Sequence, residues 1–475
     1  MKSILFAGGE VLPFAATGGL GDVLGSLPEA IKKANPDIDV RVVMPGYSCI
    51  GEKWRDQMKF VRSLTVDFSW RREGCGLYSL EKGGVTYYFV VSDHYFARPK
   101  LYGEFDDGER FAFFSYAVLE LMSAVDFFPD ILHANDWQTA ISVIALKGRY
   151  FSSERYRRVK SIYTIHNIDY QGIYDMAIFG DVFGFGDNVR NAVEFDWSIN
   201  LTKGAVICAD YVTTVSPKYA EEIQYEPTAH GLSGILRGQA HKISGIINGI
   251  DVELNDPKKD RDIPYNFSMS NLDGKARNKA ELQKKFSLDV RPDVPVIAMI
   301  SRLAEHKGFD LVMRVGREIM QNDVQIVLLG TGDKQYEDYF RALARDFPGR
   351  VGVSISYDRA LSKLIYAGAD MFLMPSKSEA CGLAQMIASR YGTVPIVHEV
   401  GGLYDTIKPY TKKSGNGFTF AAYNAHDMLY VIRQAEEVYK NSAEWTALQK
   451  KIMKIDFSWD VSARKYLTLY NDLLA

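Results

Sequence analysis

The sequence lacks the features that mark several specialised classes of protein. It has 475 residues and a net charge of −3, so it carries no excess of positive charge for nucleic acid or an anionic membrane. Its four cysteines are scattered without paired spacing, which argues against a disulfide framework and a zinc site. No apolar stretch is long enough to span a bilayer, and no signal-peptide cleavage pattern is present. We therefore expect a cytoplasmic protein.

A dinucleotide fingerprint is also missing. The first expected strand is followed by Thr17-Gly18-Gly19-Leu20-Gly21-Asp22, which is not a clean G-x-G-x-x-G. The second expected strand ends at Met44-Pro45 rather than at an acid that could hold a ribose. Both observations weigh against an NAD enzyme. The chain also has no low-complexity tract and no short-period repeat.

Strand-like runs alternate with helical ones, which predicts an α/β fold with parallel sheets. Gly83-Gly84 lies between two strand-like runs and predicts a hairpin, so some strands of the first sheet should be antiparallel. The expected strands are Ser3–Ala7, Val40–Met44, Tyr87–Ser92, Ile131–Ala134, Lys160–Ile165, Tyr211–Val215, Val294–Ile300, Val324–Leu329, Val351–Ile355, Met371–Pro375 and Pro395–Glu399. Helical periodicity in the first half covers Asp22–Lys33, Glu109–Ala124, Gln138–Arg149 and Ser198–Cys208.

The length indicates two domains of similar size. Residues 251–270 are polar and rich in Asp, Lys and Pro, so we place the junction within residues 243–271. The expected domains are residues 1–245 and 246–458, and residues 459–475 form an amphipathic helix that could dock back across the junction. Two such α/β domains most simply bind a ligand in the cleft that they face.

The segment around Glu379 is the most informative stretch for function. It follows the expected strand that begins at Met371, so Glu379 should lie at the carboxyl edge of a sheet. The amides of Cys381, Gly382 and Leu383 would form a helix amino terminus that suits a phosphate. A carboxylate beside an anion site fits a nucleotide-sugar. The alternative is a Glu that caps a helix on a surface turn.

Other polar residues also follow expected strands. Arg302 and Lys307 come after Val294–Ile300, where two cations could neutralise a departing diphosphate, although charges on exposed turns are usually only solvated. Asp136 and His166 follow two neighbouring strands of the first domain. A lone His at a strand end is more often structural, but two such residues facing one cleft favour a functional role.

Over essentially its whole length, the chain resembles the bacterial glycogen synthases and plant starch synthases, which are retaining glucosyltransferases of the two-domain GT-B fold. Eight motifs in register carry the resemblance: Gly18-Gly19-Leu20-Gly21-Asp22-Val23, His133-Ala134-Asn135-Asp136-Trp137-Gln138, Thr164-Ile165-His166-Asn167-Ile168-Asp169-Tyr170-Gln171-Gly172, Thr214-Val215-Ser216-Pro217, Ile247-Asn248-Gly249-Ile250-Asp251, Ser301-Arg302-Leu303-Ala304-Glu305-His306-Lys307-Gly308, the Glu379 segment, and Gly401-Gly402-Leu403-Tyr404-Asp405-Thr406.

The resemblance implies a role for each matching residue. Arg302 and Lys307 would bind the nucleotide phosphates, and Glu379 would contact the donor glucose. His166 would lie against the glucosyl unit, while Asp136 and Trp137 would shape the glucose and acceptor site. The expected catalytic set is Glu379, Arg302, Lys307, His166 and Asp136; the donor-binding set is Gly18, Gly19, Asn248, Cys381, Gly382 and Leu383; and the other substrate-binding residues are Trp137, Asn167 and Asp22.

The implied reaction is transfer of glucose from a nucleoside diphosphate to the non-reducing 4-hydroxyl of an α-1,4-glucan (glycogen, starch or a maltooligosaccharide) with retention. No paired acid suggests a covalent intermediate, so we expect a front-face displacement. No Asp-x-Asp follows an expected strand, so we expect neither metal nor cofactor. A length typical of bacterial members favours ADP-glucose. The alternatives are a catalytically weak glucan-binding or regulatory paralogue and a GT-B transferase with another donor, such as UDP-glucose.

The chain departs from the family pattern at four positions. The amino-terminal loop normally reads Lys-x-Gly-Gly-Leu, and here Ala16 replaces the lysine. Phe105 stands where an aromatic hydroxyl is usual, Ala384 where a hydroxyl often follows Gly-Leu, and Val400 precedes the second Gly-Gly-Leu. Together these changes would remove one charge and up to three hydroxyls from the site, so activity could be reduced.

Overall fold

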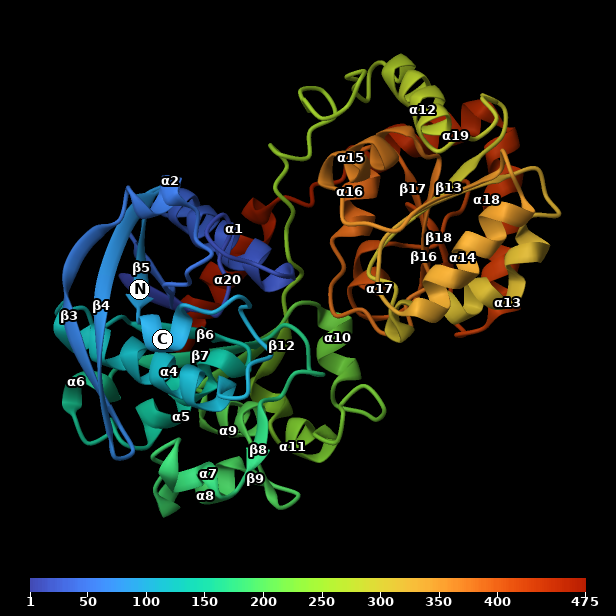
Figure 1. Ribbon diagram of the computed structural model, residues 1–475. Coiled ribbons are helices and arrows are strands. Elements are labelled where there is room, and N and C mark those ends of the chain that lie inside the picture. The colour runs from blue at the N-terminus through green and yellow to red at the C-terminus, as the bar shows by residue number, and fades with distance from the viewer. The chain divides into compact units, whose positions relative to one another are not determined.

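The computed structural model describes residues 1–475, and the chain divides into two compact units (Figure 1). Unit 1 comprises Met1–Gly249 together with Trp459–Ala475, and unit 2 comprises Ile250–Ser458. The sequence analysis places the boundary after residue 245, and the structural boundary follows Gly249. No helix has the length and apolar character needed to cross a membrane.

Unit 1 is built on a nine-stranded sheet in the order β12-β11-β7-β6-β1-β2-β5-β4-β3. The strands from β12 to β5 are parallel, and the β3–β4–β5 edge is antiparallel, as the Gly83-Gly84 signal predicts. Their bounds are β1 (Ser3–Ala7), β2 (Asp39–Pro45), β3 (Lys59–Phe68), β4 (Arg71–Lys82), β5 (Val85–Val91), β6 (Ile131–Asn135), β7 (Lys160–Ile165), β11 (Tyr211–Thr214) and β12 (Ile243–Gly245).

The helices of unit 1 include one from the carboxyl end of the chain. Helix α20 packs against α1, and the Tyr470 hydroxyl bonds Nδ1 of the buried His133 at 2.7 Å. This contact ties the last residues of the chain to β6. The helices are α1 (Gly19–Ala34), α2 (Glu52–Arg55), α3 (Asp93–Phe96), α4 (Asp107–Ala124), α5 (Trp137–Lys147), α6 (Glu154–Arg157), α7 (Ile178–Asp181), α8 (Asp187–Val193), α9 (Leu201–Cys208), α10 (Pro217–Glu222), α11 (Ser233–Gly238), the 3₁₀ turn Ala240–Lys242 and α20 (Trp459–Leu474).

A small antiparallel sheet corrects one prediction. The helix expected over Ser198–Cys208 begins only at Leu201, because Ser198–Asn200 forms strand β10 between β8 (Ile173–Asp175) and β9 (Glu194–Phe195). The two residues between β9 and β10, Asp196 and Trp197, both have positive φ, the backbone of a tight hairpin turn. The sequence gives no Asn-Gly signal for this turn.

Unit 2 has a six-stranded parallel sheet in the order β15-β14-β13-β16-β17-β18. The strands are β13 (Val296–Ile300), β14 (Gln325–Leu329), β15 (Val351–Ser354), β16 (Met371–Met374), β17 (Val394–His398) and β18 (Phe418–Phe420). The helices are α12 (Asp273–Lys285), the 3₁₀ turn Glu305–Lys307, α13 (Phe309–Ile319), α14 (Lys334–Asp346), α15 (Arg359–Gly368), α16 (Ala384–Arg390), α17 (Gly401–Thr406), α18 (Ala425–Lys440) and α19 (Ser442–Ile452).

Helices cover both faces of this sheet, because alternate residues of each buried strand point to opposite sides. On β13, Ile297 and Met299 pack with α13, α14, α18 and α19, whereas Val296 and Ala298 pack with α12, α15 and α16. Most parallel strands of both sheets therefore read as largely apolar runs, and the bounds of the predicted ones lie within two residues of those observed.

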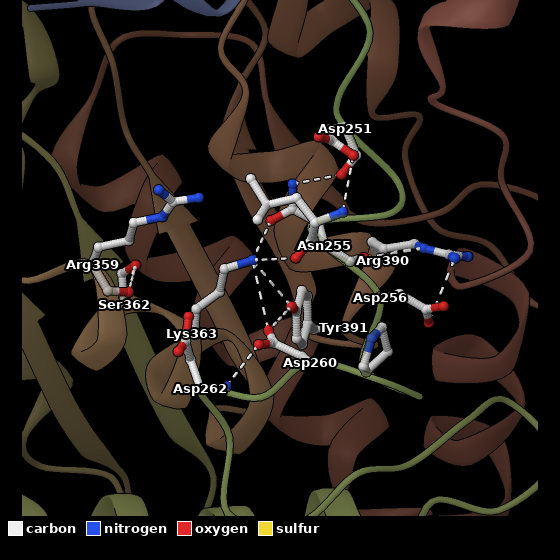
Figure 2. Close-up of polar contacts among 12 residues, drawn as sticks. Asp251, Asn255, Asp256, Asp260, Asp262, Arg359, Ser362, Lys363, Arg390 and Tyr391 are labelled. Carbon is white, nitrogen blue, oxygen red and sulfur yellow. Dashed lines mark hydrogen bonds and ion pairs between the residues drawn. The ribbon is translucent and has the colours of Figure 1, made fainter. Parts of the chain in front are cut away.

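The expected polar junction is fixed to unit 2 rather than loose. Figure 2 shows Lys363 of α15 directed at the segment that follows the boundary. Its Nζ donates to the Leu254 carbonyl (2.9 Å) and to Asn255 Oδ1 (2.6 Å), and it lies 3.6 Å from Asp260. The Tyr391 hydroxyl donates to Asp260 and completes the cluster. Two polar side chains of the segment, Asn255 and Asp260, are therefore buried against Lys363, while most of its other charged side chains are exposed.

Candidate active site

The predicted residues of unit 1 follow adjacent strands of one sheet. Strand β1 lies between β2 and β6, so the order of the sheet reverses there, and such a switch point is where open α/β folds bind ligands. The carboxyl end of β6 leads to Asp136 and that of β7 leads to His166. The carboxyl end of β1 leads to Glu10, which the sequence analysis did not single out. These three side chains therefore belong to one edge of the sheet.

Asp136 has a strained backbone at this edge. Its φ of 56° and ψ of 177° form a combination that non-glycine residues rarely adopt, and such strain concentrates at functional sites. The side chain accepts hydrogen bonds from the backbone amides of His166 (2.8 Å) and Asn167. Burial nevertheless raises the pKa of Asp136 to about 7. This carboxyl can therefore exchange a proton near neutral pH.

His166 is neutral, and its tautomer follows from the hydrogen bonds around it. Both amide hydrogens of Asn135 are donated to carbonyls, those of Ala7 and His133, each at 3.1 Å. Asn135 Oδ1 must therefore face His166 Nε2 at 2.9 Å, and Nε2 carries the proton. Burial lowers the pKa of His166 to about 3. The uncharged ring keeps Nδ1 as an acceptor for a substrate hydroxyl.

Four other predicted residues of unit 1 lie in distinct places. Trp137 begins α5 and packs edge-on against Phe111, with ring centroids 5.1 Å apart. Asn167 Oδ1 accepts from the Asp169 amide at 3.0 Å, so its side chain helps to shape its own loop. Asn248 is buried, and its Oδ1 has no hydrogen-bond partner. Asp22 lies in the first turn of α1.

The glycine loop differs from the prediction. A Cβ added to Gly18 or Gly19 would meet no atom within 4 Å, so the protein itself does not require glycine at either position. The Gly18 amide already donates to Glu10 Oε2 at 3.0 Å. The amides of Gly19 and Leu20, at the start of α1, form no hydrogen bond within the protein. The Gly18 amide is therefore occupied by Glu10, whereas the Gly19 and Leu20 amides are not used within the protein.

Tyr102 provides an aromatic hydroxyl close to Phe105 in sequence. Phe105 is fully exposed, whereas the Tyr102 hydroxyl is buried, and burial together with the nearby Tyr47 and Glu10 raises the pKa of this hydroxyl well above its usual value. A Cβ added to Gly9 would lie 2.9 Å from this hydroxyl and 3.4 Å from Cγ of Gln138, whose Oε1 is buried and unpaired. Neither residue is among the predicted site residues: Tyr102 has no sequence signal, and Gln138 is found only as part of a longer motif. Unpaired buried polar atoms are uncommon in native proteins and invite a ligand explanation.

The donor-side residues of unit 2 also follow adjacent strands. Strand β13 leads to Arg302, and its neighbour β16 leads to Glu379. Glu379 Oε2 accepts from Lys307 Nζ at 2.7 Å and from the Ser376 hydroxyl at 3.0 Å, and neither bond involves Oε1. Arg302 is exposed and forms no ion pair. The structure thus brings Glu379 and Lys307 together and leaves Arg302 unpaired.

Close backbone approaches hold the Glu379 loop in place. A Cβ on Gly308 would lie 1.9 Å from the Pro375 carbonyl oxygen, and a Cβ on Gly401 would lie 1.9 Å from the Glu379 carbonyl oxygen. The Gly402 amide donates to that same Glu379 oxygen at 3.2 Å. Two of the glycine motifs found in the sequence therefore act by positioning the carboxylate.

The helix expected behind Glu379 begins after the three residues predicted to form its amino terminus. Cys381 and Gly382 form a turn in which Gly382 has a φ of 70°, and α16 starts at Ala384. The Gln385 side-chain amide donates to the carbonyls of Cys381 (3.0 Å) and Gly382 (2.9 Å), which fixes this turn. The prediction of a regular helix amino terminus over residues 381–383 is therefore wrong in detail, although the segment keeps its place beside Glu379.

No group of three or more His, Cys, Asp or Glu side chains lies together in a way that could hold a metal ion. Transfer without a metal or a cofactor therefore stays a prediction from the sequence. The candidate cations at the donor side are the side chains of Arg302 and Lys307.

Comparison with known proteins decides the family. Residues 3–238 match the family described as the starch synthase catalytic domain, and residues 281–451 match the family described as glycosyl transferases group 1. Glycogen synthase of Ligilactobacillus salivarius (strain UCC118) is 46% identical over 99% of this chain and 100% of its own length. Glycogen synthase of Clostridium novyi (strain NT) is 44% identical over 99% of both chains. The chain belongs to the glycogen synthase family.

Solved structures agree with this family. The catalytic domain of starch synthase IV from Arabidopsis thaliana, bound to ADP and acarbose, matches with a TM-score of 0.90 and 32% identity, covering 100% of this chain and 99% of that one. Sucrose-phosphate synthase from Thermosynechococcus elongatus matches with a TM-score of 0.60 at 16% identity and supports the fold alone. The GT-B fold and the glycosyltransferase activity of a glycogen or starch synthase, both implied by the sequence motifs, are confirmed.

Proposed function

We propose that this glycogen synthase family member transfers glucose from ADP-glucose to the non-reducing 4-hydroxyl of an α-1,4-glucan with retention. The observation that carries the proposal is the ion pair of Lys307 with Glu379, together with an unpaired Arg302 that follows the adjacent strand of unit 2. Because Oε1 of the carboxylate is outside this pair, it can accept a hydrogen bond from a sugar hydroxyl. Two cations can bind a diphosphate. The ADP in the Arabidopsis starch synthase structure and its sugar-like ligand support the choice of donor and acceptor.

The proposed step is a front-face displacement. The bond between glucose C1 and the diphosphate oxygen breaks, the acceptor O4 forms a bond to C1 on the same face, and the acceptor proton goes to the departing diphosphate. Arg302 and Lys307 stabilise the negative charge that grows on that diphosphate, which is where fixed charges accelerate a reaction. Neutral His166 accepts a hydrogen bond from a glucosyl hydroxyl at Nδ1. The Asp136 carboxylate accepts the hydrogen bond of the His166 amide and so holds the His166 backbone in position.

An incorporation assay tests this function. Purified protein is incubated with glycogen primer and either ¹⁴C-labelled ADP-glucose or ¹⁴C-labelled UDP-glucose, and label in precipitated glycogen is counted. We expect incorporation from ADP-glucose. Incorporation from UDP-glucose but not from ADP-glucose would show that the donor is UDP-glucose and that this part of the proposal is wrong. Binding of glycogen without incorporation from either donor would favour a regulatory paralogue. The replacement of the motif lysine by Ala16 is the sequence feature that supports this alternative.

A further inference from the structure

Glu10 is a buried carboxylate that pairs with no cation, takes three hydrogen bonds from one loop and lies close to the Tyr102 hydroxyl. Its side chain accepts hydrogen bonds from the Thr17 amide (2.7 Å), the Thr17 hydroxyl (2.6 Å) and the Gly18 amide (3.0 Å). The residue is only 4% exposed, and it takes part in no ion pair. Burying an ionised carboxylate is costly unless it is hydrogen-bonded, and bonds to a charged acceptor are about twice as strong as neutral ones. These three bonds therefore fix Glu10 and the loop to each other.

The rest of the loop is held in a different way. Val11 and Ala15 exchange two backbone hydrogen bonds of 2.9 and 3.0 Å, so the chain up to Ala15 is closed without Glu10. The amides of Thr17 and Gly18 bond only to Glu10. Removal of the carboxylate should therefore release residues 16–19 and leave the strand and the preceding turn in place.

Position 16 adds a second observation. A Cβ added to Gly21 would lie 2.3 Å from Ala16 Cβ and 3.4 Å from Glu10 Oε2, so both side chains flank the same glycine. No lysine or arginine lies between Lys2 and Lys32 in the sequence. The loop of this chain is thus ordered by hydrogen bonds to an anion, with no nearby cation from its own segment.

We propose that Glu10 is a positioning residue for the donor: its carboxylate occupies the Thr17 and Gly18 amides and thereby directs the loop, so that the Gly19 and Leu20 amides at the start of α1 are left for the diphosphate. Amides at a helix amino terminus favour an anion. The proposal rests on the proposed function, because it assigns Glu10 a part in binding the same donor.

The test compares Glu10→Gln with two variants of Thr17, of which Thr17→Val removes the hydroxyl that bonds Glu10 and Thr17→Ser keeps it. Glutamine keeps the size of Glu10 but removes its charge, and hydrogen bonds to a neutral acceptor are about half as strong as those to a carboxylate. Hydrogen exchange of the segment Phe14–Leu20 measures the loop directly, without any substrate. We expect at least about tenfold faster exchange of the Thr17 and Gly18 amides in Glu10→Gln. Exchange elsewhere in unit 1 should stay as in the unaltered protein.

Kinetics measure the consequence. In Glu10→Gln, kcat/KM for ADP-glucose should fall about ten- to a hundredfold, while KM for the maltooligosaccharide should stay within about twofold. Thr17→Val removes one of the three bonds and should lower kcat/KM roughly fivefold. Thr17→Ser keeps the hydroxyl and should behave as the unaltered chain. This order would not arise from a general loss of folding, which melting curves report separately.

Several results would overturn the proposal. One is unchanged exchange at Thr17 and Gly18 in Glu10→Gln, and another is faster exchange with unchanged donor kinetics. An equal loss of acceptor affinity would mean that Glu10 contacts the glucan directly. If the unaltered protein transfers no glucose from ADP-glucose, the proposed function fails. Calorimetric measurement of ADP affinity then tests the positioning role of Glu10 by itself. ADP affinity that falls in Glu10→Gln would uphold the positioning role, whereas equal or absent ADP binding would reject it.

Discussion

Unit 2 contains two lysine–carboxylate networks that differ in how completely they are satisfied. Lys363 donates to Leu254, Asn255 and Tyr391, and its neighbour Asp260 is bonded by the Tyr391 hydroxyl. This network is closed: its lysine and its carboxylate side chains are 6% and 4% exposed. A closed network holds a polar segment on α15 and has no capacity left for a ligand.

The network of Lys307 and Glu379 is open by comparison. Its side chains are 20% and 11% exposed, and its hydrogen bonds from Lys307 and Ser376 use only Glu379 Oε2. Arg302, which follows the adjacent strand β13, is exposed and forms no ion pair. The contrast teaches that a buried ion pair is not evidence of function by itself. What distinguishes the candidate site is unused hydrogen-bonding and charge capacity at the carboxyl edge of the sheet.

The largest effect on stability is expected from the closed network. Lys363→Met removes the cation from a buried carboxylate, and breaking such a pair from one side costs about 3–5 kcal/mol. Urea unfolding should report this loss, while kcat of the folded protein stays unchanged. Lys334→Met, which removes an exposed pair with Asp338, is the matched control and should cost less than about 1 kcal/mol. A loss of kcat in folded Lys363→Met would contradict the claim that the closed network contributes to stability alone.

The open network should show the reverse behaviour. Glu379→Gln and Lys307→Met remove charge at the proposed donor site, and loss of one such transition-state group lowers kcat by about 10²–10³-fold. The melting temperature should change less than in Lys363→Met, because these side chains are more exposed than those of the closed network and follow strand ends. Glu437→Gln, at an exposed pair with Lys440, is the control and should keep full turnover. Near-normal turnover in either site variant would reject the assignment.

Asp136 extends the comparison to a carboxylate without a cation. Its folded pKa of about 7 lies above the ordinary 3.8, so the unfolded chain loses this proton first as pH rises. Its contribution to stability is therefore fully present below about pH 4 and is lost as pH rises through 7, by at most about 1.4 kcal/mol per pH unit. Asp136→Asn should flatten the pH dependence of the unfolding free energy in this window. An unaltered slope would show that Asp136 is ionised throughout.

The smallest expected effect comes from adding a cation to the glycine loop. Ala16→Lys supplies the charge that the family motif has, and a charge-assisted contact is worth about 1.5–3 kcal/mol, or ten- to a hundredfold in rate. Glu10 flanks the same glycine and would pair with the new lysine, so we expect a gain at or below about tenfold in kcat with ADP-glucose. Ala16→Met is the control of similar length. No gain over that control would place the loop away from the phosphates.

Much of the fold could be predicted because buried strands have a simple signal. The run Lys160–Ile165 is strand β7 as expected, since both faces of a parallel strand are apolar or matched by neighbours. Strand β10 was missed because its pairing with β8 is not local and its turn uses Asp196 and Trp197. The polar composition of residues 251–270 places the domain junction there, but it cannot show that the segment is fixed to unit 2, because its buried partner Lys363 lies about a hundred residues away.

The site was predictable to the extent that its residues follow strands. Asp136, His166, Arg302 and Glu379 could be placed at sheet edges from the strand pattern alone. Glu10 could not, because a single acid after an expected strand has no partner motif in the sequence. Its role depends on the amides of Thr17 and Gly18 folding back onto it, which only the structure displays.

Arg302 allows the most direct test of the central claim, that the open network of unit 2 carries glucose transfer from ADP-glucose. The measurement is the initial rate of labelled glucose incorporation into glycogen, per folded protein, for the unaltered chain, Arg302→Ala and Lys363→Met. The account predicts clear transfer by the unaltered chain, a fall of about 10²-fold or more in Arg302→Ala, and full transfer in Lys363→Met. Equal rates in the unaltered chain and Arg302→Ala, or a loss confined to Lys363→Met, would contradict it.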